Sequence, residues 1–198
     1  MRALTGPEVH QMLGACENTP WHSIFHTLTW TGLRRSELLG LRWRDVDLIL
    51  ATLRVVQTLQ KLNTGEFIYQ EPKTAAGRRT IALSPASCLE LRAHREKQER
   101  YAETLGISLT DDTLIFSHPD GSPRVPLTVT AAFRSLTRRI GLEGVRLHDL
   151  RHTMASLYLR QGVTENRCGE AGPRICSNYA RPLQPLPSRC PGSSSSAV

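Results

Sequence analysis

Apolar residues recur at helical spacing through most of residues 1–163, which predicts a chain built mainly of helices. Thr5 with Glu8 three positions later forms a capping box, so a helix should begin there. The run from Trp21 is apolar at nearly every turn and should be a buried helix ending near Gly32. By the same reasoning, further helices are expected within 34–43, 84–106, 128–141 and 148–162.

Three segments are instead rich in β-branched and aromatic residues, namely 52–62, 66–71 and 78–84. The first two are joined at Asn63-Thr64-Gly65, which is typical of a hairpin, and the last two at the sequence PKTAAG. The expected fold is therefore mainly α with a small three-stranded antiparallel sheet, an α+β arrangement.

Composition limits the size and setting of this fold. A chain of 198 residues with 39% hydrophobic content can bury one ordinary core, so one domain plus a tail is expected. No apolar run is long enough to span a membrane and no secretory signal opens the chain, which favours a cytoplasmic protein. The five cysteines have no CxxC spacing, so we expect reduced thiols, not disulfides or a zinc site.

The formal net charge of +7 favours an anionic partner such as nucleic acid or an acidic membrane face. Arg34, Lys73 and the pair His148 and Arg151 are candidates for binding a phosphate together, the last two in the first turn of a helix. Each has an ordinary alternative, since Arg34 and Arg35 also fit a surface pair and Lys73 a solvated turn lysine.

Two histidine pairs have the four-residue spacing that can bind a metal on a helix, His148 with His152 and His22 with His26. Neither pair has a carboxylate or thiolate at a suitable place in the sequence, so no metal is expected. His22 and His26, flanked by aromatic residues, fit the edge of the core better.

The order of the motifs TGLRRSELLGLRWRDVD, EPKTAAGRRTIAL and RLHDLRHTMASL resembles the catalytic domain of the tyrosine recombinases, the phage integrase family, from about Leu4 to Val163. The resemblance implies that Arg34 is the first catalytic arginine and Glu37 a supporting acid. It makes Lys73 the lysine between the second and third strands, and His148 and Arg151 the histidine and second arginine. It places His152 beside the site as a packed neighbour.

The resemblance also implies a reaction. A tyrosine hydroxyl attacks a phosphodiester of double-stranded DNA, leaving a 3′-phosphotyrosyl link and a free 5′-hydroxyl, with no cofactor and no metal. Intact relatives are expected to act as DNA-bound oligomers.

After Thr164 the helical pattern stops, and residues 165–198 hold five of the twelve prolines and a four-serine run. In register with the family, the last active-site histidine falls at Arg174 and the tyrosine nucleophile at Gln184. Tyr179, the tail's only tyrosine, lacks an apolar helix to aim it. We therefore expect an incomplete catalytic domain at 1–163, a disordered aberrant tail at 164–198 from a break in the reading frame, and no nucleophile. The start of the chain almost at the first catalytic helix suggests a fragment.

Three hypotheses of different classes remain open at this point. The chain is a catalytically inactive recombinase domain, a DNA-binding remnant that competes for sites, or a metal-dependent nuclease that uses the histidine pairs. A covalent protein–DNA adduct separates the first from the second, and sensitivity to EDTA identifies the third.

Overall fold

The computed structural model of the chain describes residues 2–71 and 77–160. Its helices within these ranges are α1 (Gly6–Gly14), α2 (His22–Thr31), α3 (Arg35–Leu39), α4 (Pro85–Thr104), α5 (Pro126–Arg139) and α6 (Asp149–Arg160), with a 3₁₀ turn, η1 (Trp43–Asp45). Its strands are β1 (Val46–Asp47), β2 (Thr52–Val55), β3 (Thr58–Lys61), β4 (Phe67–Gln70) and β5 (Arg79–Ala82). The expected boundary at 163 and the tail lie outside the described residues.

The predicted caps form, which explains why these helices begin where they do. Thr5 and Glu8 make both halves of the capping box of α1. The Ser84 hydroxyl accepts the Ser87 backbone N–H at 3.1 Å, and Pro85 takes the first turn of α4. Within the described ranges, no helix combines the length and apolar character needed to cross a bilayer.

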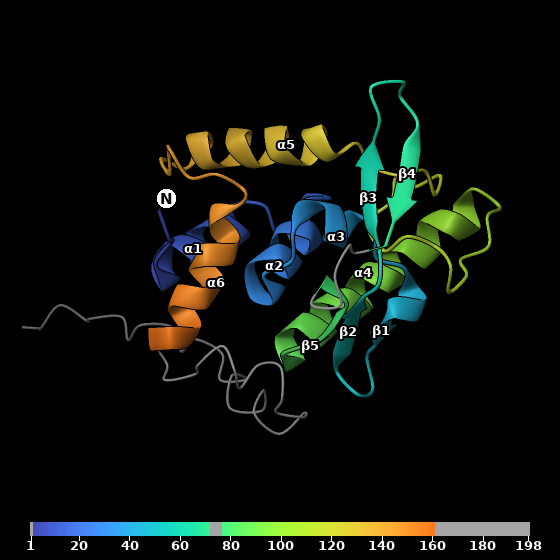
Figure 1. The fold of residues 1–198 in the computed structure, drawn as a ribbon, viewed down its shortest axis with the longest axis horizontal. Coiled ribbons are helices and arrows are strands. Elements are labelled where there is room, and N and C mark those ends of the chain that lie inside the picture. Colours follow the sequence, from blue (N-terminus) through green and yellow to red (C-terminus); the bar gives the residue numbers. More distant parts are fainter. Residues whose placement is uncertain (1, 72–76, 161–198) are drawn as a thin grey trace, which may run out of the picture.

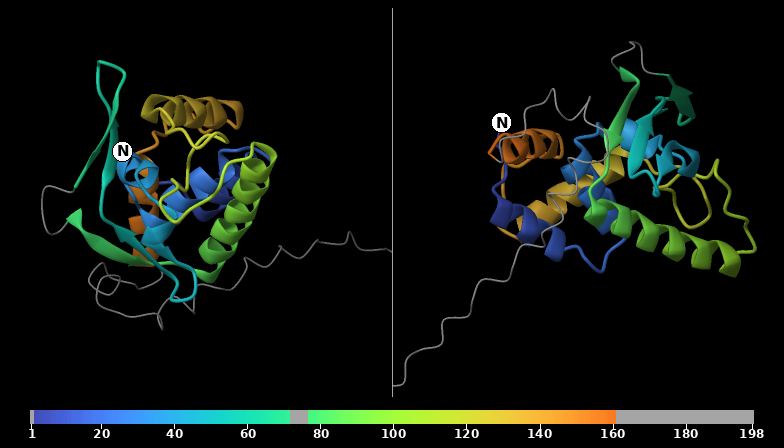
Figure 2. Two further views of the ribbon diagram at one scale, coloured as in Figure 1. Left: turned by 90° about the vertical axis from the view of Figure 1, so that its right-hand side faces the viewer. Right: turned by 90° about the horizontal axis from the view of Figure 1, so that it is seen from below.

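The strands are antiparallel, as predicted, but they form two sheets, and the segment 52–62 is divided. β2 pairs with β1 and β5, and β3 pairs with β4 across the Asn63–Gly65 turn. The single three-stranded sheet expected from 52–62, 66–71 and 78–84 is therefore wrong in its membership. The break falls at Val56 and Gln57, where the Gln57 side chain donates to the Gly40 carbonyl at 2.7 Å. The β3–β4 hairpin projects from the body of the molecule (Figures 1 and 2).

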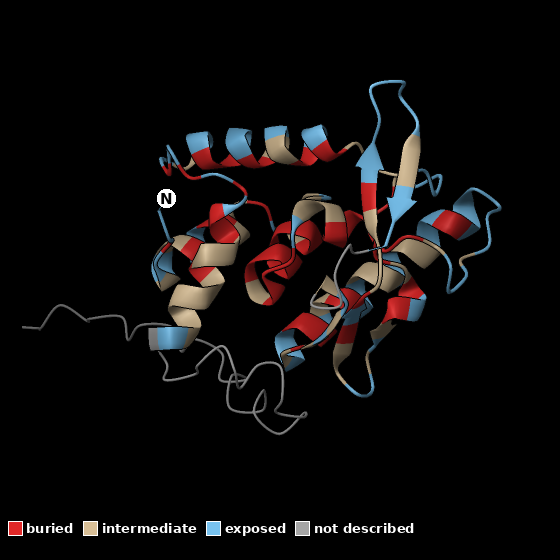
Figure 3. Cartoon of the chain, viewed as in Figure 1, coloured by how far each residue is buried: buried red, intermediate tan, exposed pale blue. Residues whose placement is uncertain are grey.

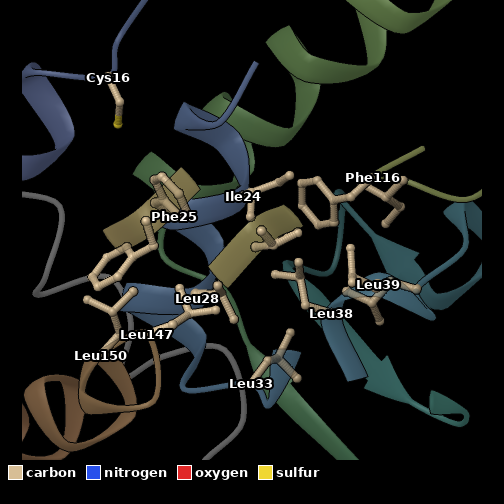
Figure 4. Packing of buried hydrophobic residues seen from close by; sticks show 14 of the residues in the cluster. Cys16, Ile24, Phe25, Leu28, Leu33, Leu38, Leu39, Phe116, Leu147 and Leu150 are labelled. Atoms are coloured by element: carbon tan, nitrogen blue, oxygen red, sulfur yellow. The ribbon is translucent and has the colours of Figure 1, made fainter. Parts of the chain in front are cut away.

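Helix α2 lies at the centre of the core, and most of its residues are buried (Figure 3). Phe25 packs edge-on against Phe133 of α5 with ring centroids 5.2 Å apart. Leu28, Leu147 and Leu150 meet on the side toward α6 (Figure 4). Burial of apolar surface stabilises a fold by about 25 cal/mol per Å². This stabilisation holds helices that are distant in sequence around α2.

Helix α5 shows the amphipathic pattern in its simplest form. Its buried face carries Val129, Phe133 and Leu136, and its arginines lie on the exposed face (Figure 3). The outward face of α5 is therefore free to carry charge without cost to the core.

Candidate functional site

The corner between α2 and α3 brings the first predicted arginine next to α6. Gly32 ends α2 in the left-handed conformation, with φ 61° and ψ 24°. A Cβ added at Gly32 would lie 2.3 Å from Cε of Met154 on α6. Glycine thus permits both the turn and the close approach of α6. Arg34 follows in extended conformation and forms the N-cap of α3.

Glu37 lies beneath this corner and is only 2% exposed. Its carboxylate accepts the backbone N–H of Arg34 at 2.8 Å and the Arg34 guanidinium at 2.9 Å. Arg79 of β5 donates to both carboxylate oxygens, at 2.8 and 3.2 Å. Burial alone would raise the pKa of Glu37, but the hydrogen bonds from Arg79 and Arg34 hold that pKa below its ordinary value. The ionised carboxylate therefore orients both guanidinium groups.

Sequence reasoning did not identify Arg79. The available signal was Glu37 itself, because a glutamate within the apolar stretch SELLGL indicates a buried carboxylate that requires cations. The sequence offers many arginines, and only the packing of β5 against α3 selects this one.

The start of α6 carries the second pair of predicted residues. The helix begins at Asp149, so His148 directly precedes it, and only Arg151 lies in the first turn. The buried Asp149 carboxylate accepts the Arg146 backbone N–H at 3.0 Å and its guanidinium at 3.3 Å. Burial would raise the pKa of Asp149, but these hydrogen bonds from Arg146 lower it. The Arg151 guanidinium donates to the Gly32 carbonyl at 2.8 Å, which ties α6 to the end of α2.

His152 lies one turn after His148, and the two rings meet edge to face with centroids 5.4 Å apart. Its Nε2 atom is buried and makes no hydrogen bond with any described residue. The structure thus places His152 next to His148 as a packed neighbour.

The predicted arginines and His148 meet at one open hollow of about 450 Å³. Arg34, Arg35, Arg146, His148 and Arg151 line it over an apolar floor, and none of its described lining residues is acidic. The Arg35 guanidinium reaches across to the Thr130 hydroxyl of α5 at 2.5 Å. Arg34, His148 and Arg151 therefore share one concave surface, although more than half of the chain separates Arg34 from the other two.

Four further positions named from the sequence lie outside the described residues. Lys73 belongs to the connection between β4 and β5, and Arg174, Tyr179 and Gln184 belong to the segment after residue 160. The described residue Arg79, which begins β5 after this connection, contacts Glu37 beside Arg34.

The pair His22 and His26 lies at the edge of the core, as expected, but it does have a carboxylate beside it. Glu90 of α4 contacts His22 Nδ1 at 3.1 Å and accepts from the Ser23 hydroxyl at 2.6 Å. Because 68 positions separate His22 from Glu90, the local sequence around the histidine pair gives no sign of this contact. Burial lowers the pKa of His26 to about 4. Among the described residues, no group of three His, Cys, Asp or Glu could hold a metal ion.

Comparison with known proteins relates the chain to DNA integrases. The pattern that defines the phage integrase family matches residues 2–168. The ICEBs1 integrase of Bacillus subtilis (strain 168) is 32% identical over 139 residues, which cover 70% of this chain and 37% of that protein. An integrase of Streptomyces ambofaciens is 30% identical over 200 residues, which cover 93% of this chain and 50% of that protein. The chain thus spans half or less of the length of these relatives.

Solved structures agree on the fold. The Tn1549 transposon integrase in complex with a circular intermediate DNA matches with a TM-score of 0.71 at 20% identity, over 90% of this chain and 60% of that one. XerA recombinase matches with a TM-score of 0.64 at 20% identity, over 93% of this chain and 60% of that one. With the family pattern covering most of its length and the fold in agreement, the chain belongs to the phage integrase family and has the fold of a tyrosine recombinase catalytic domain.

Proposed function

We propose that the hollow between α3 and α6 binds a phosphodiester of double-stranded DNA, and that the parent protein cleaves and rejoins DNA there in site-specific recombination. The observation that carries this proposal is the convergence of Arg34, His148 and Arg151 on one hollow whose described lining includes no acid.

The chemistry of these groups suits a phosphate. An arginine guanidinium matches two phosphate oxygens at once, and two such groups lining one hollow can hold both non-bridging oxygens. The positive end of the α6 helix dipole, next to His148, adds a favourable field for an anion. Because Glu37 neutralises charge beneath Arg34 and not within the hollow, the net charge at the opening stays positive.

In the parent reaction a tyrosine oxygen forms a bond to phosphorus while the bond from phosphorus to the 5′-oxygen breaks. Arg34 and Arg151 stabilise the extra negative charge of the five-coordinate transition state. His148 donates a hydrogen bond to it or moves a proton, and Lys73 protonates the leaving 5′-oxygen. The phosphotyrosyl link conserves the energy of the broken bond, so a 5′-hydroxyl can reverse the step and rejoin the strand.

For the present chain we propose binding without cleavage. In register with the family, Gln184 occupies the nucleophile's position, and an amide cannot replace a phenolate. Without a nucleophile in line with the leaving oxygen, a phosphate held by two arginines is not cleaved. Such a chain would act as a competitor for duplex DNA.

Duplex binding as a function of salt tests the phosphate site. We expect weak binding of a 30-bp duplex that falls steeply between 50 and 200 mM salt, because each neutralised phosphate contributes about −0.9 to the slope of log K against log salt. Arg34→Gln and His148→Gln should each weaken binding, the former with a shallower slope. Arg100→Gln on the exposed face of α4, outside the hollow, serves as the matched control.

Fluorescence anisotropy measures the affinities, and thermal unfolding shows whether each variant is folded at the assay temperature. Affinity that does not change with salt, or that falls equally in Arg34→Gln and Arg100→Gln, would contradict the proposed site.

A further inference from the structure

Arg79 lies outside the phosphate hollow but touches a residue that the hollow depends on. It begins β5 and directs both terminal nitrogens of its guanidinium to the carboxylate of Glu37, at 2.8 and 3.2 Å. It is not among the described residues that line the hollow. Any influence of Arg79 on a phosphate bound there therefore passes through Glu37.

Arg34 and Arg79 share Glu37 unequally. Arg79 holds both carboxylate oxygens in a fork, the arrangement in which a guanidinium pairs best with a carboxylate. Among the described residues, the Arg34 guanidinium makes one hydrogen bond, from Nη1 to a single oxygen of Glu37. The Arg34 side chain is 57% exposed, against 27% for Arg79. Arg34 thus keeps donors that can reach a ligand in the hollow.

The charges of the three residues do not cancel. Glu37 is buried, so its carboxylate needs a cation beside it in place of water. One carboxylate between two guanidinium groups leaves one positive charge in excess. Arg79 is the less exposed partner and holds both oxygens, so the excess charge lies on Arg34, which lines the hollow.

We propose that Arg79 is a positioning residue for the phosphate site, because it neutralises Glu37 and so leaves the positive charge of Arg34 available to DNA. This inference rests on the proposed function and identifies what allows Arg34 to serve it.

The loss of Arg79 would redirect Arg34. Arg34 would be the remaining cation in contact with Glu37 among the described residues. A buried carboxylate without a counterion costs more free energy than a solvent-screened ionic contact contributes. The Arg34 guanidinium would therefore turn to cover both oxygens of Glu37. The hollow would lose a positive charge although Arg34 is still present.

A double-mutant cycle on the full chain tests this dependence. Fluorescence anisotropy with a 30-bp duplex gives the salt slope for Arg34→Gln, Arg79→Gln and the double variant. Each single variant should lower the slope by about 0.9, which reduces the affinity ratio between 50 and 200 mM salt about threefold. The double variant should lose the same amount and not twice that amount, because both changes remove one charge from the hollow. Arg79→Lys keeps the charge and should keep the slope.

The neighbouring Arg78 provides the matched control. It is exposed and pairs with Glu71, so Arg78→Gln removes the same charge without touching Glu37. Any effect of Arg78→Gln should add to that of Arg34→Gln, as a purely long-range effect of charge would.

The pKa of Glu37, measured by NMR titration of its carboxyl carbon, gives a second readout. Burial raises this pKa, and the hydrogen bond from Arg79 is the largest contribution that lowers it. The pKa should therefore rise in Arg79→Gln and stay low in Arg79→Lys. An unchanged pKa in Arg79→Gln would show that Arg79 does not neutralise the carboxylate.

Thermal unfolding shows whether Arg79→Gln is folded. If it is not, Glu37→Gln combined with Arg79→Gln takes its place, because this pair removes the buried charge together with its counterion. Arg34 then has no carboxylate to neutralise, so adding Arg34→Gln should again lower the slope by about 0.9. No loss of slope in that background would overturn the proposal.

The failures of the two proposals can be distinguished. If Arg34→Gln lowers the slope but Arg79→Gln does not, or if their losses add, the role of Arg79 is wrong and the phosphate hollow stands. If Arg34→Gln leaves duplex binding by the otherwise unaltered chain unchanged, the proposed function fails and the role of Arg79 fails with it.

Discussion

Glu37 is a buried carboxylate that receives four hydrogen bonds from Arg34 and Arg79. Removing one member of such a group leaves a buried charge without an opposite charge beside it. The resulting loss in the free energy of unfolding is larger than the contribution of an exposed ion pair. Arg34 itself is 57% exposed in its side chain, so its orientation depends on this contact and not on packing.

Glu37→Gln should lower the free energy of unfolding at pH 7 by about 2 to 4 kcal/mol, because the neutral amide cannot compensate two arginines. Since folding lowers the pKa of Glu37, its contribution is present above the ordinary value of 4.5 and is lost as pH falls through the folded pKa. The difference between the variant and the unaltered chain should therefore shrink on acidification.

Urea unfolding measured from pH 7 to pH 3 checks this, with the exposed Glu96→Gln as control. Equal stability of Glu37→Gln and the unaltered chain at pH 7 would show that the carboxylate does not hold the corner.

At the scale of elements, the packing of α6 against α2 brings the two halves of the hollow together. Gly32 allows this approach, and the Arg151 guanidinium then reaches the Gly32 carbonyl. The same packing explains why residues near position 34 and position 151 form one surface.

Gly32→Ala should destabilise the chain by about 1 to 2 kcal/mol from the left-handed conformation alone, with a further cost from overlap with Met154. Met154→Ala removes the overlap but not the backbone strain. A double-mutant cycle by chemical denaturation should therefore show that the two substitutions together cost less than their sum. If the costs of the two substitutions are strictly additive, the Met154 side chain of α6 does not restrict the space at Gly32.

At the scale of the whole molecule, binding a phosphate and cleaving a strand are separate capacities. The described residues supply Arg34, His148 and Arg151 to one hollow. We propose, from the register with the family, that the nucleophile's position falls at Gln184, so the chain should bind a phosphate and should not cleave a strand.

On a suicide duplex substrate the chain should form no covalent adduct, and Tyr179→Phe should change nothing, because the register with the family puts Gln184 and not a tyrosine at the nucleophile's position. Replacing the residues after Val163 with an in-frame family segment that carries the last active-site histidine and the tyrosine nucleophile should recover adduct formation. The same segment with that tyrosine changed to phenylalanine is the control. Denaturing gels detect the adduct. An adduct of the present chain that Tyr179→Phe abolishes would overturn this assignment.

The sequence alone determined the features that depend on near neighbours along the chain. Thr5 with Glu8 and Ser84 with Pro85 fixed the helix starts, Gly32 fixed the end of α2, and Asn63–Gly65 fixed the hairpin. Each of these is a hydrogen bond or a dihedral preference within a few residues, so local patterns suffice. The order of the arginine and histidine motifs likewise identified the family.

Tertiary structure alone decided the partners that lie far apart in sequence. It divided 52–62 into two strands, because the backbone of β3 packs against Gly40, where a Cβ would lie 3.1 Å from the Leu59 nitrogen. It also chose Arg79 for Glu37, Glu90 for His22 and Thr130 for Arg35. The sequence does not distinguish one arginine, glutamate or threonine from another as a partner. Only the packing of β5, α4 and α5 against the central helices brings a particular side chain within hydrogen-bonding distance of its partner.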